Sequence, residues 1–285
     1  MLRMDDNAVQ DIVTNTDYRV DFTYDRTKII YTRYKQGSKN PETFTYDWKN
    51  GVSQKLGQNQ AYKRIFLNEN VYVGFDDTGY KEVDLSSGKE RELFTYKEFP
   101  SRLSRFVANV SENGVVTNPD SMTISKDRNH IFMVFALGQN NEGIYRYSLQ
   151  DDKNDELIVR AEEILQYSLL NNGDIMLNGR VNGTSGIFLY DSSNKEYKML
   201  KKGDFLGFEW DESRSRLAYM QMLDEQRSKN ELHVAYLRND ILQSDTIIYR
   251  NIQSFYKLTW LEDSLFVGGS TLDSSEIYRF TFKVW

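Results

Sequence analysis

The feature that most constrains the fold is an internal repeat, in which one pattern of strands and turns recurs along the whole chain. The stretch SMTISKDRNHIFMVFALGQNNEGIYRYSL, Ser121 to Leu149, shows it most fully: an alternating strand, a polar turn, an almost wholly apolar strand, a loop and a further strand. Related units begin at Tyr18, Tyr62, Leu165, Phe205 and Phe255. A repeat of roughly 40–50 residues is typical of the four-stranded blade of a β-propeller, so the chain predicts about six blades.

The turns and the second strands of the units agree with this interpretation. An acidic or amide residue recurs in the first turn of each unit, at Asp25, Asn68, Asp127, Asn171, Asp211 and Glu262. Several later turns carry the pairs Asn50-Gly51, Ser87-Gly88 and Asn172-Gly173, whose residues tolerate the positive φ of tight hairpins. The near-continuous apolar runs HIFMVF (130–135) and RLAYMQM (216–222) indicate strands covered on both faces.

The expected fold is therefore all-β: a single six-bladed β-propeller domain over residues 1–285, built of four-stranded blades, with a seven-bladed ring as the alternative. The last unit lacks one strand, because the chain ends at Trp285 directly after its third. The N-terminal segment Asn7–Val13 has the length of a strand. We expect it to supply the outer strand of the last blade and so remove a free sheet edge.

One segment, residues 96–120, interrupts the repeat between the second and third units. Its aromatic and arginine side chains are of the types that dominate binding hot spots. Tyr96, Phe99, Arg102 and Arg105 are therefore the candidate residues for binding a ligand or partner, and the two arginines would orient an anionic group. In the competing interpretation, Phe99 and Phe106 anchor the segment on the ring and both arginines are solvated.

Composition excludes several functional classes. The formal net charge is −6 and Lys and Arg are spread along the chain, which does not match the basic footprint of a nucleic-acid binder. No run approaches 18 apolar residues, so no membrane span is expected. The N-terminus has no apolar signal-peptide core. Cysteine is absent, which excludes disulfides, thiolate metal sites and thiol nucleophiles.

No motif of catalytic chemistry is present. The two histidines, His130 and His233, have no partner at metal-ligand spacing and are expected to be structural. G-x-S-x-G, P-loop and G-x-G-x-x-G motifs are absent, and the glycine cluster NGRVNGTSG (178–186) is expected to be a hairpin loop. The acidic runs at 151–156 and at Asp76–Asp77 depart from a calcium loop and are expected to be solvated turns. Neither catalytic residues, nor a metal, nor a cofactor is predicted.

The units resemble the bacterial TolB-type propeller repeat, in which a first strand ends in Ser-Pro-Asp-Gly, an apolar strand follows, and a third strand reads IYxxD. The matching stretches are ISKDRNHIFMVF with GIYRYSL, FEWDESRSRLAY with LHVAYL, and SEIYRF. The resemblance covers nearly the whole chain, but no unit has the family's proline. It implies the fold more than a function, because such repeats occur in periplasmic and surface binding proteins, in lyases and as gating domains of serine peptidases. No peptidase domain or nucleophile motif follows here.

The resemblance and the lack of catalytic motifs favour a non-catalytic binding or scaffold propeller that binds a protein partner, or a small or glycan ligand, at one face of the ring. The resemblance also implies an exported bacterial protein or a lipoprotein ectodomain, the latter with a lipid anchor before the start of this chain; a cytoplasmic protein is the alternative. The competing function is a polysaccharide-active hydrolase or lyase with its site at the channel mouth. A subunit of an envelope assembly is the third hypothesis, and it predicts a large apolar patch.

Overall fold

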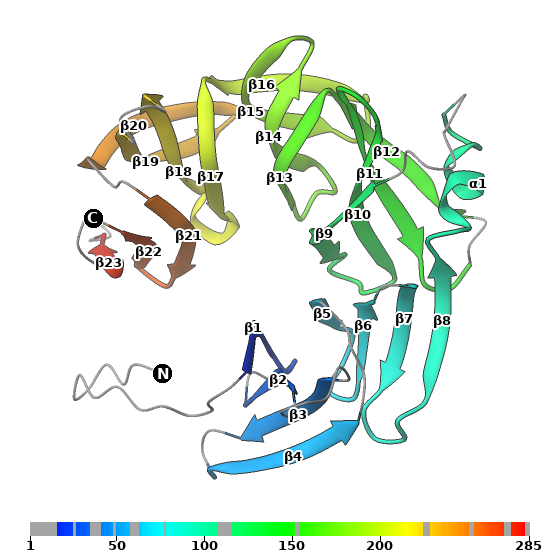
Figure 1. The fold of residues 1–285 in the computed structure, drawn as a ribbon. Coiled ribbons are helices and arrows are strands. Elements are labelled where there is room, and N and C mark those ends of the chain that lie inside the picture. Colours follow the sequence, from blue (N-terminus) through cyan, green and yellow to red (C-terminus); the bar gives the residue numbers. More distant parts are fainter. Residues whose placement is uncertain are drawn as a thin grey trace. The chain divides into compact units, whose positions relative to one another are not determined.

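The computed structural model describes residues 16–24, 27–34, 41–47, 50–57, 63–76, 78–107, 116–151, 154–224, 229–250, 254–270 and 275–282. Within these ranges the chain forms six antiparallel sheets that follow one another along the sequence (Figure 1). The protein is thus an all-β, six-bladed β-propeller with four-stranded blades. The predicted fold class is confirmed in its six-bladed rather than its seven-bladed form.

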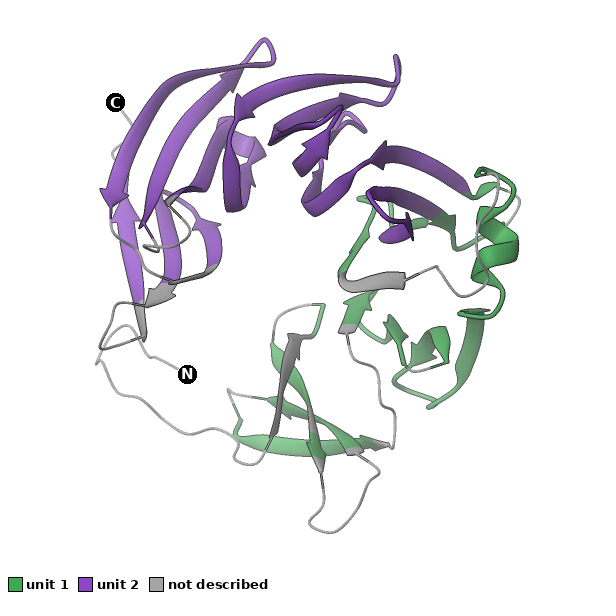
Figure 2. Ribbon diagram, turned by 45° about the horizontal axis from the view of Figure 1, so that its top comes forward, with its two compact units in different colours: residues 1–133, 147–155 green, residues 134–146, 156–285 purple. Residues whose placement is uncertain are grey.

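The chain divides into two compact units, which are described separately. Unit 1 comprises residues 1–133 and 147–155, and unit 2 comprises residues 134–146 and 156–285 (Figure 2). The division falls within the sequence of the third sheet. The pocket described below belongs to unit 1, and the largest cluster of ionisable side chains described below belongs to unit 2.

The first two sheets lie in unit 1. The first contains β1 (Thr16–Phe22), β2 (Lys28–Tyr34), β3 (Pro41–Asp47) and β4 (Val52–Gly57) in this order. The second contains β5 (Lys63–Phe66), β6 (Val71–Phe75), β7 (Gly79–Asp84) and β8 (Glu90–Thr95). Neighbouring strands are also neighbours in sequence, as the hairpin-rich repeat predicts.

The helix α1 (Phe99–Leu103) follows β8. Pro100 stands in its first turn, where the missing N–H costs no hydrogen bond. Phe99 and Leu103 are four residues apart, share one face of the helix and are both buried. The segment 96–120 set apart in the sequence thus contains this helix, and its last residues already belong to β9.

The third sheet contains β9 (Val116–Ile124), β10 (His130–Gly138), β11 (Asn141–Ser148) and β12 (Glu156–Ala161). The fourth contains β13 (Glu163–Leu169), β14 (Ile175–Val181), β15 (Thr184–Asp191) and β16 (Glu196–Lys202). The fifth contains β17 (Asp204–Asp211), β18 (Arg216–Asp224), β19 (Lys229–Arg238) and β20 (Ile241–Arg250). A 3-10 turn, Glu212–Arg214, joins its first two strands. The sixth contains β21 (Ser254–Leu261), β22 (Ser264–Ser270) and β23 (Ser275–Thr281).

Middle strands carry the core, as their apolar runs predict. In β10 the five residues from Ile131 to Phe135 are all buried. The last strand of the fifth sheet, β20, is exposed along most of its length. In unit 2, apolar side chains of the fourth and fifth sheets form one buried cluster, and those of the fifth and sixth sheets form another. These three sheets therefore bury their middle strands by packing against their neighbours in sequence, which a single blade could not do alone.

In the first turns of two units, the recurrent acidic or amide residue closes the turn. Asp127 Oδ1 accepts hydrogen bonds from the Ser125 hydroxyl (2.5 Å) and from the Asn129 amide N–H (3.1 Å). Asn68 Oδ1 plays the same role for the amides of Asn70 and Val71. These are side-chain mimics of a backbone turn, which explains why the position favours Asp or Asn in unit after unit.

The glycine cluster at 178–186 is a hairpin, as predicted. Asn182 (φ +50°) and Gly183 (φ +73°) form a two-residue turn between β14 and β15, and both need the left-handed region. Gly179 has a different role. A Cβ atom there would lie 2.0 Å from the carbonyl oxygen of Glu163, so only glycine lets β13 and β14 pair at this point.

The sixth sheet has three strands among the residues described, with β23 at one edge. The segment Asn7–Val13, expected to complete this blade, lies outside the described residues, so closure stays a prediction. The part of the chain that is described contains no helix of the length and apolarity needed to span a membrane.

Candidate functional site

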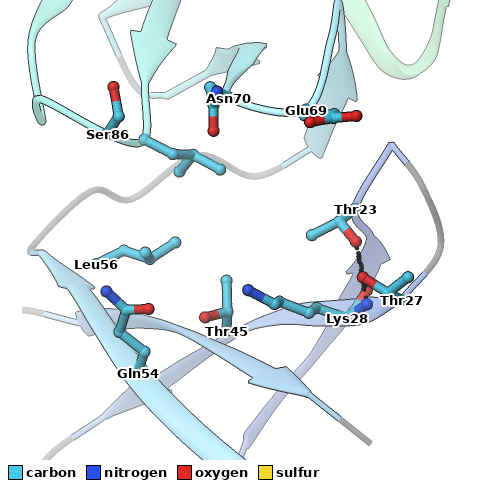
Figure 3. Close-up of a pocket in the computed structure, with 10 residues that line it drawn as sticks. Thr23, Thr27, Lys28, Thr45, Gln54, Leu56, Glu69, Asn70 and Ser86 are labelled. Atoms are coloured by element: carbon cyan, nitrogen blue, oxygen red, sulfur yellow. Dashed lines mark hydrogen bonds between the residues drawn. The ribbon is translucent and has the colours of Figure 1, made fainter. Parts of the chain in front are cut away.

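A pocket of about 320 Å³ opens between the first two sheets, within unit 1. Figure 3 shows one wall built from the first sheet and the facing wall built from the turns of the second. The lining residues are Thr23, Thr27, Lys28, Thr45, Gln54, Leu56, Glu69, Asn70, Leu85 and Ser86. A volume near 300 Å³ is at the lower end of the range for small-molecule sites. The pocket therefore suits a small ligand.

The turn between β1 and β2 positions the cation of the first wall. The Thr23 amide donates to the Lys28 carbonyl at 2.9 Å, and the Thr23 hydroxyl donates to the same oxygen at 3.1 Å. The Lys28 amide in turn donates to the Thr23 hydroxyl at 3.1 Å. This fixed backbone directs the Lys28 side chain into the pocket, as Figure 3 shows. Gln54 and Leu56 are two residues apart on β4 and so share one face of the sheet.

Two turns of the second sheet form the other wall. Asn68 Oδ1 accepts the Asn70 amide at 2.8 Å, which fixes the turn that carries Glu69. The Leu85 amide donates to the Asn70 carbonyl at 2.7 Å and ties this turn to the next one. Both walls are therefore held by short-range hydrogen bonds to the backbone, so the backbone that carries the lining residues is fixed before any ligand arrives.

Five polar side chains of this lining make no hydrogen bond or ion pair with any residue that the structure describes: Lys28, Thr45, Gln54, Glu69 and Asn70. They offer one ammonium, one carboxylate, two amides and one hydroxyl. Thr45 is only 6% exposed and its hydroxyl lines the pocket. A buried polar group that has no protein partner, such as the Thr45 hydroxyl, gains most from a ligand that supplies one.

Leu56 and Leu85 give the pocket an apolar side. Both pack on a buried cluster of Ile30, Phe66, Tyr72 and Val83, which joins the first two sheets below the pocket. The leucines are thus anchored in the core at one end and face the pocket at the other. A small apolar group of a ligand could extend this cluster.

The four candidate residues from the sequence, Tyr96, Phe99, Arg102 and Arg105, lie together around α1, and none of them lines the pocket. Phe99 is 1% exposed and meets Phe94 edge-on, with ring centroids 4.4 Å apart. Tyr96 contacts the ring of Tyr80 at 6.1 Å, also edge-on. Both rings attach the segment to the second sheet, and for Phe99 this agrees with the competing interpretation.

The two arginines share one buried carboxylate. Asp155 Oδ2 accepts from Arg102 Nη1 at 3.1 Å and from Arg105 Nη2 at 3.3 Å, and Asp155 Oδ1 accepts from the Ser148 amide at 3.1 Å. The Arg102 side chain is 17% exposed, whereas that of Arg105 is 44% exposed. Arg102 is thus paired rather than solvated, and the expectation of a solvated turn at 151–156 is wrong for Asp155. A contact of these residues with a ligand stays a prediction.

Unit 2 holds a second cluster of ionisable groups, which the sequence did not reveal. Asp245 on β20 accepts hydrogen bonds from Lys201 Nζ at 2.5 Å and from the Tyr219 hydroxyl at 2.7 Å, and it lies 3.0 Å from His233 Nδ1. The rings of Tyr219 and His233 stack with centroids 4.8 Å apart. His233 Nε2 lies 3.5 Å from a carboxylate oxygen of Glu231.

The chemistry of this second cluster favours a structural role. Burial raises the pKa of Tyr219, and the hydrogen bond to Asp245 raises it further, so the phenol keeps its proton. Burial alone would raise the pKa of Asp245, but the bonds from Lys201, Tyr219 and His233 outweigh this and lower it. A phenol that holds its proton and a weakly basic carboxylate make a poor acid–base pair for catalysis at neutral pH. The hydrogen bond between His233 and Asp245 and the stacking of His233 on Tyr219 agree with a structural role for His233, which stays a prediction.

One further carboxyl group in unit 2, that of Glu209, has a raised pKa. Burial raises the pKa of Glu209 on β17 to about 7, and the positive charge of Lys257 opposes this only in part. A carboxylate with such a pKa can exchange protons near neutrality. Glu209 does not line the pocket.

The other acidic run considered for calcium also has a local explanation. Asp76 Oδ1 accepts from the Thr78 amide at 2.7 Å and Asp76 Oδ2 accepts from Lys81 Nζ at 2.7 Å, so this carboxylate caps a turn and forms an ion pair. No group of three His, Cys, Asp or Glu side chains with metal-binding geometry occurs within the described ranges.

No protein-family model matches the chain, and no curated protein matches it either. Solved structures do. An oligogalacturonate lyase in complex with manganese aligns with a TM-score of 0.67 at 12% identity, over 94% of this chain and 74% of the lyase. A prolyl endopeptidase aligns with a TM-score of 0.64 at 11% identity, over 92% of this chain and 40% of the peptidase. TolB from Acinetobacter baumannii aligns at 0.50 and 14% identity, over 76% of this chain and 51% of TolB.

At these identities the similarity shows the fold alone. TolB is among the similar structures, which supports the TolB-type resemblance for the propeller fold, whereas no family model supports membership of that repeat family. The fold is shared by a lyase, peptidases and TolB, so it does not by itself select a function.

Proposed function

We propose that the protein is a non-catalytic binding propeller that takes a small ligand in the pocket between its first two sheets. The observation that carries this proposal is the set of five polar side chains, Lys28, Thr45, Gln54, Glu69 and Asn70, that converge on one pocket without partners among the described residues. A few converging polar groups beside an apolar surface are the usual composition of a small-molecule site. The rigid turns on both walls lower the entropy cost of binding.

The lining favours binding over catalysis. One lining hydroxyl, that of Ser86, donates to a carboxylate oxygen, Asp84 Oδ1, at 2.6 Å. Hydrogen bonds from Ser86 and Ser87 lower the pKa of Asp84, which makes it too weak a base to activate the serine at neutral pH. The ten lining residues include no histidine.

The alternative function is a polysaccharide-active hydrolase or lyase, for which the similarity to oligogalacturonate lyase is the support. That function needs acid and base groups that face a substrate. The Tyr219–His233–Asp245 cluster combines the right residue types, but Tyr219 is completely buried and its pKa is raised. The geometry therefore supports the binding function better.

Cellular location and partners belong to the same proposal. An exported bacterial protein, or a lipoprotein ectodomain, agrees with the TolB-type resemblance of the repeats and with the fold shared with TolB. In this setting the propeller would present its ligand, or a ligand-dependent surface, to another protein of the same compartment. Fractionation of the native host with an antibody against the chain tests the location; a wholly cytoplasmic signal would refute it.

The pocket is tested by ligand screening with a blocking variant. Gln54→Trp places a large side chain into the pocket from β4. Val52→Trp is the matched control, because Val52 lies on the same face of the same strand, is exposed and does not line the pocket. Thermal-shift screening of metabolites and short glycans should give ligands that stabilise the wild type and Val52→Trp but not Gln54→Trp.

A ligand that stabilises all three proteins equally would place binding elsewhere and overturn the pocket assignment. Turnover of a bound glycan, detected by mass spectrometry and lost in Gln54→Trp, would overturn the non-catalytic assignment in favour of the enzyme. Melting of Gln54→Trp alone, without ligand, should match that of Val52→Trp, because both replace exposed residues of β4.

A further inference from the structure

We infer that the pocket recognises a small zwitterion of dipeptide size, with a carboxylate at one end and an ammonium at the other. This inference deepens the proposed function and rests on it. It starts from the two charged residues of the lining, which have opposite signs and stand on opposite walls: Lys28 on the first sheet and Glu69 on a turn of the second (Figure 3).

Lys28 and Glu69 do not neutralise each other. They form no ion pair together, and neither one pairs with another residue in the described part of the chain. A purely anionic ligand would be attracted by Lys28 but repelled by Glu69. A purely cationic ligand would be attracted by Glu69 but repelled by Lys28. A ligand that carries both charges satisfies both walls, and each wrong charge is penalised, which is how a site gains specificity.

Because the two charges stand on opposite walls, a zwitterion whose ends are well separated suits them better than the smallest zwitterions do. In a free α-amino acid the ammonium and the carboxylate share one carbon atom, so they cannot meet two opposite walls independently. A dipeptide separates them by two residues, roughly 7 Å of extended chain. Its ends could therefore reach Lys28 and Glu69 at the same time.

The remaining unpartnered groups suit a peptide bond. Gln54 and Asn70 each offer an amide with one acceptor and two donors, from β4 and from the facing turn respectively. A peptide group has one N–H donor and one carbonyl acceptor, and it can pair with a side-chain amide at both atoms. The pocket thus holds a partner for each end of a dipeptide and for its centre.

Leu56 and Leu85 complete the set. Both continue a buried apolar cluster toward the pocket, so an aliphatic side chain of the ligand would lie against them. The ten lining residues include no aromatic ring, so a flat ligand would find no stacking partner. A branched aliphatic side chain fits the two leucines better.

The test uses the dipeptide alanyl-leucine with the full chain, by isothermal titration calorimetry at low salt. Three probes isolate the charges: the N-acetylated dipeptide lacks the ammonium, the dipeptide amide lacks the carboxylate, and galacturonate is an anionic sugar of similar size. We expect the dipeptide to bind at least tenfold more tightly than any of the three. The heat of dipeptide binding should be absent in Gln54→Trp and unchanged in Val52→Trp.

Two variants assign the ends of the ligand. Glu69→Gln should weaken the dipeptide about tenfold but leave the N-acetylated form unchanged, because the lost charge has no partner there. Lys28→Met should weaken the dipeptide equally and leave the dipeptide amide unchanged. Lys97→Met is the matched control, since Lys97 is exposed and does not line the pocket. Far-UV circular dichroism of each variant should match the wild type.

The outcomes separate this inference from the proposed function. An affinity for the dipeptide that is unchanged in both Glu69→Gln and Lys28→Met would overturn the inference. Binding of galacturonate or another screened ligand in preference to the dipeptide, blocked by Gln54→Trp, would also overturn it but leave the proposed binding function standing. Failure of every ligand in the broad screen to respond to Gln54→Trp would overturn both.

Discussion

Asp155 Oδ2 lies 3.1 Å from Nη1 of Arg102, and the Asp155 side chain is completely buried. A carboxylate removed from water is stable only with a charged partner and hydrogen bonds to its remaining lone pairs. Arg102 and Arg105 supply the charge, and the Ser148 amide supplies a bond to Oδ1. This contact attaches the segment around α1 to the last part of the third sheet that belongs to unit 1.

Asp155→Asn should therefore lower the free energy of unfolding strongly. Loss of one partner of a buried ion pair leaves the other charge uncompensated, which costs about 3 kcal/mol. Urea unfolding followed by circular dichroism measures the change. Asp240→Asn is the control, because Asp240 is exposed and pairs only loosely with Lys198 at 3.6 Å, and it should cost less than about 0.5 kcal/mol. Equal stability of the two variants would show that Asp155 is not held as the structure indicates.

The two arginines should differ in their effects. Arg102 also lies over the rings of Phe94 and Tyr147, at 5.8 and 5.6 Å, so Arg102→Ala removes packing as well as charge and should cost about 2 kcal/mol. Arg105 is 44% exposed, and Arg105→Ala should cost about 0.5 kcal/mol. If Arg105 also contacts a partner, Arg105→Ala weakens that binding at nearly unchanged stability. Unchanged binding of an identified partner after both replacements would count against the predicted contact.

The fold was readable from the sequence because a propeller repeats its local chemistry. Every unit carries a turn residue such as Asp127 and a strand such as His130–Gly138, and several independent copies of one pattern reinforce each other. The pocket offers no such redundancy. Lys28, Gln54, Glu69 and Ser86 come from four different elements of two sheets, so no spacing along the chain brings them together. Only the packing of the first two sheets does.

The cluster around α1 was found by residue type but with an incomplete role. Arg102 lies in α1 and Arg105 in the turn directly after it, and both reach one carboxylate. Their partner, Asp155, stands some fifty positions later in an acidic run that reads as a solvated turn. The carboxylate Asp245 was missed for the same reason, because its partners Lys201, Tyr219 and His233 lie on three other strands.

Acid should weaken unit 2 through Asp245. Its pKa is lowered in the folded chain from the ordinary 3.8, so the fold binds the ionised form more tightly than the unfolded chain does. This stability is present above pH 3.8 and is lost as the pH falls through the lowered folded pKa. Asp245→Asn should remove this dependence and lower stability by about 1–2 kcal/mol at pH 7. Urea unfolding between pH 7 and pH 3 measures the free energy of unfolding as a function of pH, with the exposed Asp204→Asn as the control. If wild type and Asp245→Asn lose stability equally as the pH falls, Asp245 is not the source of the acid sensitivity.

The closure of the sixth sheet can be tested without knowing the position of its last strand. If residues 7–13 pair with the edge of β23, removal of residues 1–15 exposes that edge and should lower the free energy of unfolding, with greater aggregation. Removal of residues 1–6 is the control and should have little effect. Hydrogen exchange gives a second measure, because amides of β23 should exchange faster only in the longer truncation. Equal exchange in the two truncations would contradict closure by this segment.

A rise in pH from 4.5 to 8 should lower the stability of unit 2 through Glu209. Its pKa is raised by burial from 4.5 to about 7, so the folded chain holds a proton that the unfolded chain releases. The resulting stability is fully present below pH 4.5 and is lost as the pH rises to about 7, by an amount of order 2–3 kcal/mol. Glu209→Gln keeps the shape without the charge and should be more stable than the wild type at pH 8 but nearly equal to it at pH 4.5. Denaturant unfolding across this range measures the difference, and the exposed Glu196→Gln provides the control. A constant difference between Glu209→Gln and the wild type from pH 4.5 to pH 8 would show that Glu209 titrates normally.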